Sequence, residues 1–230
     1  MGTNRLTYRI KLALFFLCAI ATLLIVNTAY RGINTLTVLN EVEAERDQWQ
    51  RPSDVIQALD LRPGNTVVDL GCGSGYFTLK LSAPVGKSGK VLAEDIRRLP
   101  LVFLWIRTVL KNERNVAVQH GDPTDPRLPT QDVNAVLIAN TYHEFTDSQA
   151  ILAHVFQSLV PGGRLVVVDR APQAEAVEST ETAMEHHEVS SDQVEVELRK
   201  AGFEIVSRND KFIENDPYNE NWWLMTSRKP

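Results

Sequence analysis

The stretch that decides the fold reads Val67-Val68-Asp69-Leu70-Gly71-Cys72-Gly73-Ser74-Gly75-Tyr76-Phe77-Thr78. Two β-branched residues followed by an acid are typical of the end of a buried strand, and the apolar spacing becomes helical from Tyr76 onward. Glycines let the chain turn sharply and let a ligand approach the backbone. The helix that follows directs its first N–H groups toward such a ligand. The pattern therefore predicts a small-ligand site between a strand and a helix.

The glycine spacing separates two classes of ligand. A dinucleotide fingerprint has its third glycine at the position of Tyr76, whereas the third glycine here is Gly75. The Asp-x-Gly-x-Gly-x-Gly form resembles the first motif of class I S-adenosylmethionine-dependent methyltransferases, in which the loop wraps the methionine half of the cofactor. The resemblance implies that Asp69, Gly71, Gly73 and Gly75 bind S-adenosyl-L-methionine. A dehydrogenase is disfavoured by Tyr76.

Two further predicted strands end in acids. The second runs from Lys90 to Ile96, and Asp95 lies about 20 residues past the last glycine, where a carboxylate can accept hydrogen bonds from two ribose hydroxyls. The alternation of a strand sends Glu94 to the opposite face. The third strand ends at Asp122, which the resemblance places against the adenine edge. The next residue, Pro123, has no N–H to offer beside it.

The remaining elements follow in the order of the family. Four segments match its later strands: 133–140, 160–169, 201–206 and 222–226. The resemblance covers roughly Trp49 to Arg228. It implies an α/β, Rossmann-like fold with a seven-stranded, mostly parallel sheet whose last strand is antiparallel. Helices would cover both faces, and an N-terminal hydrophobic helix would precede the sheet.

Methyl transfer requires few catalytic residues. A sulfonium methyl is already activated, so transfer depends on positioning, with a base only where the nucleophile carries a proton. We predict His143, directly after the fourth strand, as that base because histidine titrates near neutrality; the alternative is an exposed loop histidine. Asn140, at the same strand end, is predicted to bind the cofactor. Asp169 is either a pocket acid or a cap. His187 is predicted to border the pocket, and we expect no metal, because it and its neighbour His186 do not form a ligand pair.

The N-terminal part differs from the rest. Residues 1–30 form a signal-anchor or signal segment, since Leu12–Tyr30 is uncharged and nearly as long as the roughly 20 residues that span a bilayer. Asn27-Thr28-Ala29 is a poor cleavage site, so we favour a single-pass membrane anchor over export after signal cleavage. Residues 31–51 are predicted to be a linker and lead-in helix, and residues 52–230 the methyltransferase domain.

The composition narrows the classes of partner that we expect the protein to bind. A formal net charge of −5 gives no basic footprint, so we expect no nucleic-acid partner. Two cysteines, Cys18 and Cys72, support neither a disulfide framework nor a metal site. We therefore expect methyl transfer to an unidentified, small-molecule acceptor by a membrane-tethered enzyme with no obligate protein partner. The alternative is a methyltransferase-like binding module that has lost turnover. The fold does not identify the acceptor.

Overall fold

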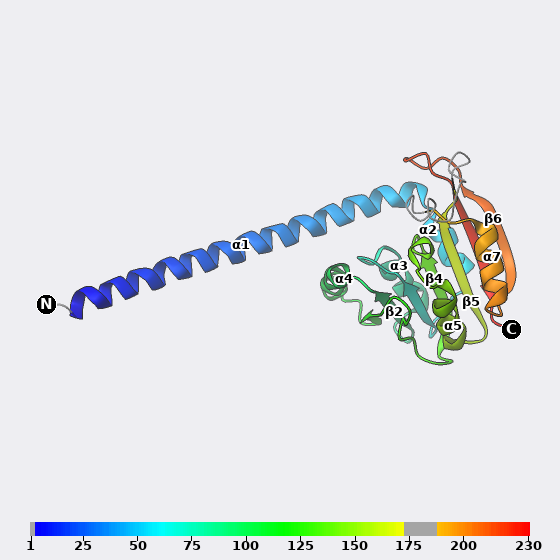
Figure 1. Ribbon diagram of the computed structural model, residues 1–230, viewed down its shortest axis with the longest axis horizontal. Coiled ribbons are helices and arrows are strands. Elements are labelled where there is room, and N and C mark those ends of the chain that lie inside the picture. The colour runs from blue at the N-terminus through cyan, green and yellow to red at the C-terminus, as the bar shows by residue number, and fades with distance from the viewer. Residues whose placement is uncertain (1–2, 173–187) are drawn as a thin grey trace. The chain divides into compact units, whose positions relative to one another are not determined.

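The computed structural model describes residues 3–172 and 188–230. The chain divides into two compact units, Met1–Glu45 and Arg46–Pro230. Helix α1 (Thr3–Trp49) makes up the first unit, and its last turn belongs to the second (Figure 1). Large apolar side chains such as Phe15, Leu17 and Leu23 are exposed along it. Among the described residues, one helical stretch, Leu14–Trp49, is long and apolar enough to cross a membrane.

The second unit is built on one seven-stranded sheet with the order β3-β2-β1-β4-β5-β7-β6. Strands β1 to β5 pair in parallel, and β7 is antiparallel to both of its neighbours. This arrangement confirms the predicted fold class. The strands are β1 (Thr66–Leu70), β2 (Lys90–Asp95), β3 (Val116–His120), β4 (Val133–Ala139), β5 (Leu159–Arg170), β6 (Glu204–Ile213) and β7 (Trp222–Arg228).

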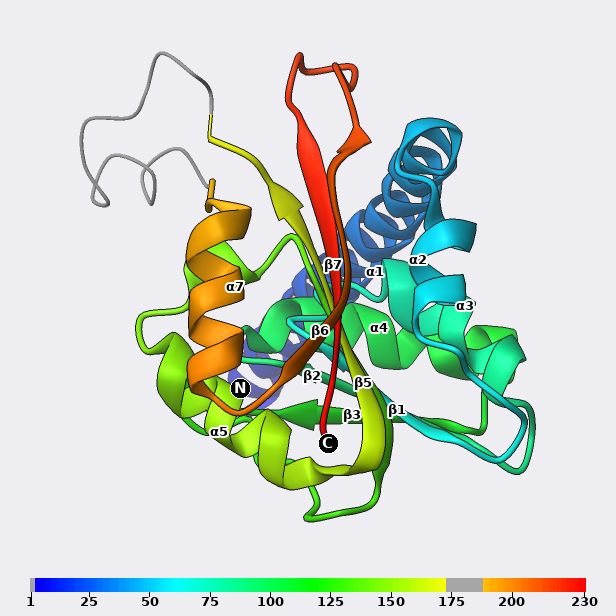
Figure 2. The same cartoon turned by 90° about the vertical axis from the view of Figure 1, so that its right-hand side faces the viewer.

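Helices cover both faces of the sheet. Figure 2 shows α5 (Ser148–Ser158) and α7 (Ser191–Lys200) on one side and α2 (Pro52–Ala58) and α3 (Tyr76–Val85) on the other. Helix α4 (Arg98–Lys111) packs on the outer strands β2 and β3. Because side chains alternate along a strand, neighbouring residues enter different cores. Val67 packs with the α2 and α3 side chains, and Val68 packs with those of α5 and α7.

The strand order positions the site. The chain leaves β1 toward β2 and β3 on one side, while β4 and β5 continue the sheet on the other side. A crevice opens where the direction of such a sheet reverses, at the carboxyl ends of its strands. The residues at this edge are the glycine loop after β1, Asp95 at the end of β2, Asn140 after β4 and Asp169 near the end of β5. The fold thus brings most of the predicted site residues to one edge.

Candidate active site

The three glycines of the loop serve different purposes. All three have positive φ, a conformation that side chains disfavour. A Cβ on Gly71 would lie 2.1 Å from Cγ2 of Thr141, and one on Gly75 would lie 2.3 Å from Cδ1 of Leu104. A Cβ on Gly73 would meet no atom within 4 Å. The protein's own packing therefore requires Gly71 and Gly75, whereas Gly73 leaves open space above the backbone, as a bound ligand needs.

The Asp95 side chain holds this loop in place. Its Oδ2 accepts a hydrogen bond from the Gly73 amide at 2.8 Å, and its Oδ1 accepts one from the Arg97 amide at 2.7 Å. The residue is 2% exposed. Each carboxylate oxygen has more than one acceptor direction, so Asp95 can still accept hydrogen bonds from ribose hydroxyls. The sequence predicted an acid at this strand end but not its hold on the loop.

Three acids meet at this edge of the sheet. Asp69 is buried and accepts a hydrogen bond from the Thr78 hydroxyl at 2.5 Å. Burial raises the pKa of the Asp69 carboxyl to about 6, and burial together with the charge of Asp95 raises the pKa of the Glu94 carboxyl to about 8. With a pKa near 8 the Glu94 carboxyl is mostly protonated at neutral pH, so it adds little negative charge there. A positive charge bound nearby, such as that of a sulfonium, would stabilise the ionised forms of these acids.

A pocket of about 170 Å³ opens beside Asp95. Glu94 enters it from the opposite face of β2, as the alternation predicts, and its Oε1 is buried with no hydrogen-bond partner among the described residues. The sequence did not indicate Glu94 as a pocket residue. The lining is mostly apolar and includes Leu70, Ile96, Pro123, Pro126, Phe145 and Ile151.

Two further residues predicted to bind the cofactor, Asp122 and Asn140, lie at the same edge of the sheet. Asp122 lines the pocket, but its carboxylate is half exposed and pairs with Arg127 at 2.6 Å. An adenine amino group would have to share that carboxylate with the guanidinium. Asn140 follows β4 with φ 55°, a conformation that asparagine tolerates. Its Oδ1 is buried without a hydrogen-bond partner in the described part of the chain, so it can accept from a ligand.

These residues fit S-adenosyl-L-methionine. The cofactor carries ribose hydroxyls, amino groups and a sulfonium charge. The edge offers the carboxylate of Asp95, the open backbone at Gly73, and two side-chain oxygens that have no hydrogen-bond partner among the described residues, on Glu94 and Asn140. A buried acceptor without a partner costs about 1–3 kcal/mol, which a donor from the ligand would recover.

His143 forms a buried pair with Asp169. It lies in the short 3₁₀ helix η1 (Tyr142–Glu144), and its Nδ1 is 2.8 Å from Oδ1 of Asp169. The two side chains are 1% and 0% exposed. Asp169 also accepts hydrogen bonds from the amides of His143 and Arg170. The alternative of an exposed loop histidine is therefore wrong. The sequence left the role of Asp169 open because only the β4–β5 pairing brings the two residues together.

His186 and His187 lie outside the described residues.

Tyr76, which separated the loop from a dinucleotide motif, has a structural role that the sequence did not reveal. Its hydroxyl lies 2.8 Å from Oδ1 of Asp47, and the Arg46 guanidinium lies 4.0 Å from the centre of its ring. Tyr76 therefore holds the last turn of α1 against the helix that begins at the glycine loop.

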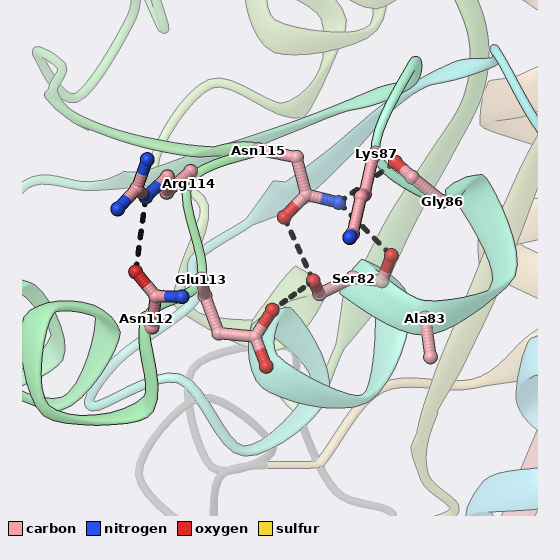
Figure 3. Close-up of a pocket in the computed structure, with 8 residues that line it drawn as sticks. All are labelled: Ser82, Ala83, Gly86, Lys87, Asn112, Glu113, Arg114 and Asn115. Carbon is pink, nitrogen blue, oxygen red and sulfur yellow. Dashed lines mark hydrogen bonds between the residues drawn. The ribbon is translucent and has the colours of Figure 1, made fainter.

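A larger cavity of about 700 Å³ lies elsewhere, between the end of α3 and the start of β3 (Figure 3). Its polar groups bond to one another: the Ser82 hydroxyl donates to Oδ1 of Asn115 at 2.8 Å, and Asn115 Nδ2 donates to the backbone carbonyls of Ser82 and Gly86 at 3.0 Å. It lies toward the amino ends of the strands, away from the switch point, so we assign it no ligand. Among the described residues, no group of three or more His, Cys, Asp or Glu side chains could hold a metal.

Comparisons with known proteins show the family of this chain. The family model described as the ubiE/COQ5 methyltransferase family matches residues 25–190. A 2-phytyl-1,4-naphtoquinone methyltransferase of Thermosynechococcus vestitus is 31% identical over 121 residues, 52% of this chain and 53% of the relative. The ubiquinone/menaquinone biosynthesis C-methyltransferase UbiE of a Marinomonas species is 32% identical over 124 residues, 53% and 48% of the two chains. The chain spans about half the length of the curated relatives it matches.

A solved structure shows the same fold. A SAM dependent methyltransferase from Aquifex aeolicus superposes with a TM-score of 0.69 at 20% identity, over 85% of this chain and 98% of that one. The likeness confirms the Rossmann-like architecture. The family match confirms the resemblance to class I methyltransferases and, with it, the predicted cofactor, S-adenosyl-L-methionine.

The loop geometry predicts different effects for three glycine substitutions. Gly73→Ala costs about 1–2 kcal/mol of backbone strain, and its methyl group fills the open space, so calorimetry should show cofactor affinity falling roughly tenfold or more. Gly162→Ala is the matched control, since it too has positive φ and open space but lies at the start of β5. It should leave affinity unchanged. Gly71→Ala should lower the melting temperature most. Normal cofactor affinity in Gly73→Ala would contradict this placement.

The raised pKa of Glu94 predicts a pH effect on stability. The unfolded chain releases the Glu94 proton near 4.5, whereas the folded chain keeps it until about pH 8. Between these values the folded state holds more protons, so rising pH destabilises it by up to about 1.4 kcal/mol per pH unit. Urea unfolding of Glu94→Gln at several pH values should show a shallower loss of stability than the wild type. An identical pH dependence in the two proteins would mean that Glu94 titrates as an exposed acid.

Proposed function

The chain belongs to the ubiE/COQ5 methyltransferase family, and we propose that it transfers the methyl group of S-adenosyl-L-methionine to a small aromatic acceptor of the quinol class. The names of two relatives refer to quinones. The observation that carries the proposal is the loop that Asp95 fixes around the open backbone of Gly73. The loop offers a site for the methyl donor at the edge of the sheet where His143 and Asp169 also lie.

In the proposed site each cofactor residue has one task. Asp95 accepts hydrogen bonds from the ribose hydroxyls while it holds Gly73, and Asp122 receives the adenine amino group. The loop carries the methionine half, with Asp69 keeping the loop and α3 in register through Thr78. Asn140 accepts a hydrogen bond from the ligand through its Oδ1. Once bound, the cofactor supplies an electrophilic methyl group on a sulfonium.

We assign the base role to His143. A quinol hydroxyl is a weak acid, and loss of its proton spreads negative charge onto the neighbouring ring carbon. That carbon takes the methyl group as the bond between the methyl carbon and the sulfonium sulfur breaks, which leaves a neutral thioether. The carbon then releases its own proton to solvent, which restores the aromatic ring. Since the Asp169 carboxylate only accepts, Nδ1 of His143 carries a hydrogen, and Nε2 is the nitrogen that takes up the phenolic proton. Asp169 positions the ring and stabilises the imidazolium that forms, as the acid does in a catalytic triad.

The burial of the pair bears on this assignment in two ways: it keeps water out, and it means that the acceptor must displace the groups covering His143, Glu144 among them, to reach Nε2. With side chains 1% and 0% exposed, His143 and Asp169 are shielded from water, where a newly formed ion pair interacts more strongly than in solvent. The mostly apolar lining of the pocket beside Asp95 suits the adenine ring of the cofactor. We further propose that the apolar part of α1 anchors the chain in a membrane, where an apolar quinol dissolves.

The proposal predicts label transfer. The full chain, given methyl-labelled S-adenosyl-L-methionine and a chemically reduced demethylated naphthoquinol, should move label into the organic phase. His143→Gln should slow the transfer by roughly a hundredfold or more with cofactor affinity unchanged. Asp169→Asn should also slow it and alter its pH profile. His154→Gln, which changes a part-exposed histidine on α5, is the matched control and should transfer at the normal rate.

Two results would contradict the proposal at different points. A chain that binds the cofactor yet labels no quinol would overturn the acceptor class and favour a binding module. If His143→Gln transferred label at the normal rate, the base assignment would be wrong, and the buried pair would serve only to join β4 to β5.

A further inference from the structure

Helix α4 carries an exposed apolar stripe. Leu101 and Leu104 face inward and pack against Cys72 and Ala93. The other side of the helix is apolar as well, and much of it lies open to solvent. Its exposed side chains are Leu99 at 68%, Val102 at 51%, Trp105 at 59%, Val109 at 60% and Leu110 at 71%.

The stripe is continuous rather than scattered. Leu99, Val102, Trp105 and Val109 follow one another at intervals of three and four residues, which places them on one side of a helix. In the described part of the Arg46–Pro230 unit, six of the nine large apolar side chains that are exposed lie between Ile96 and Leu110. The other three are Val196, Val206 and Tyr218. Single exposed apolar residues are ordinary, but a continuous group marks a contact surface.

The charge around the stripe is positive. No acidic residue occurs from Ile96 to Asn112, although the whole chain has a net charge of −5. Arg98 and Lys111, at the two ends of the helix, are exposed. Arg107 instead faces inward, where it donates to the Ser74 carbonyl at 2.7 Å. An apolar face with basic residues at its ends and an exposed tryptophan matches the headgroup layer of an anionic bilayer.

We propose that α4 is a second membrane-contacting element, lying in the headgroup layer of an anionic phospholipid bilayer with its apolar stripe toward the acyl chains. The inference rests on the membrane location proposed for this chain. A tether raises the local concentration of lipid, so an interfacial helix of modest affinity is sufficient. Ile96 and Arg97, just before α4, line the cofactor pocket. Docking through α4 would therefore hold the start of that helix, and the pocket residues just before it, close to the membrane surface.

A second copy of the chain fits this surface less well. In a two-fold dimer the same patch meets itself. Antiparallel α4 helices would place Arg98 near the partner's Lys111, and parallel ones would place like residues side by side. Either arrangement brings basic groups together with no acid on the helix to compensate. Figure 1 shows α4 on the opposite side of the domain from α7 and β6, so the stripe is separate from that edge of the sheet.

Site-specific fluorescence in the full chain tests the proposal. An environment-sensitive dye is attached to Val109→Cys in a Cys18→Ala background. The labelled protein is reconstituted into phosphatidylcholine vesicles that contain a minority of phosphatidylglycerol and doxyl-labelled lipid. Val196→Cys in the same background is the matched control, because Val196 is equally apolar and 67% exposed but lies on α7. Dye on the native Cys18 of α1 reports the anchor separately. Cys72 is buried and does not compete for the dye.

We expect doxyl lipid to quench the dye at position 109 by roughly half, as for a probe in the interfacial layer, and to leave position 196 bright. Arg98→Gln with Lys111→Gln should weaken the quenching. A quenched Cys18 with an unquenched 109 would overturn the α4 proposal and leave the anchor intact. An unquenched Cys18 would instead contradict the anchor. A dye at 109 that shifts to the blue without quenching would show that protein covers α4, and would also overturn the proposal.

Discussion

The hydrogen bond from the Gly73 amide to the Asp95 carboxylate is the contact on which the rest of the site depends. The parallel pairing of β1 with β2 sets it up, because Leu70 lies beside Glu94 and the amides of Gly71 and Cys72 both donate to the Glu94 carbonyl. The chain then turns back over the end of β2, where Asp95 holds it. A buried carboxylate with two backbone donors is stable there. Burial at the same edge raises the pKa values of the Asp69 and Glu94 carboxyls, and the neighbouring Asp95 raises both further.

A second contact links the two halves of the site. The Thr141 side chain lies where a Cβ of Gly71 would be, and its hydroxyl donates to the Gly71 carbonyl at 3.3 Å. Because Gly71 has no side chain, Thr141 can pack directly against the cofactor loop. Thr141 is two residues before His143, so this contact fixes the loop relative to the buried His143–Asp169 pair. Methyl transfer depends on such positioning more than on strong acid–base chemistry. In our account, Gly71 sets the spacing between donor and base, and Gly73 leaves room for the donor.

The sequence predicted the parts of this arrangement that local spacing encodes. The glycine loop and the acid at the end of β2 follow from patterns within a few residues, and the mostly parallel sheet with an antiparallel last strand follows from the family resemblance. Contacts between distant segments were not predictable. The pairing of His143 with Asp169 requires the register of β4 with β5. The contact of Tyr76 with Asp47 requires the last turn of α1, which belongs to the Arg46–Pro230 unit, to pack on α3. Glu94 was correctly placed on the face opposite Asp95, but only the three-dimensional pocket shows that this face also borders the site.

The most direct test of the central claim is calorimetric titration of S-adenosyl-L-methionine into the full-length Asp95→Ala variant, with Asp132→Ala as control. Asp132 is exposed at the amino end of β4, so its substitution removes the same charge far from the loop. The account predicts that Asp95→Ala lowers the affinity by roughly tenfold or more, since it removes charge-assisted hydrogen bonds to the ligand and to Gly73. Asp132→Ala should bind like the wild type. A folded Asp95→Ala variant with unchanged affinity would contradict the account.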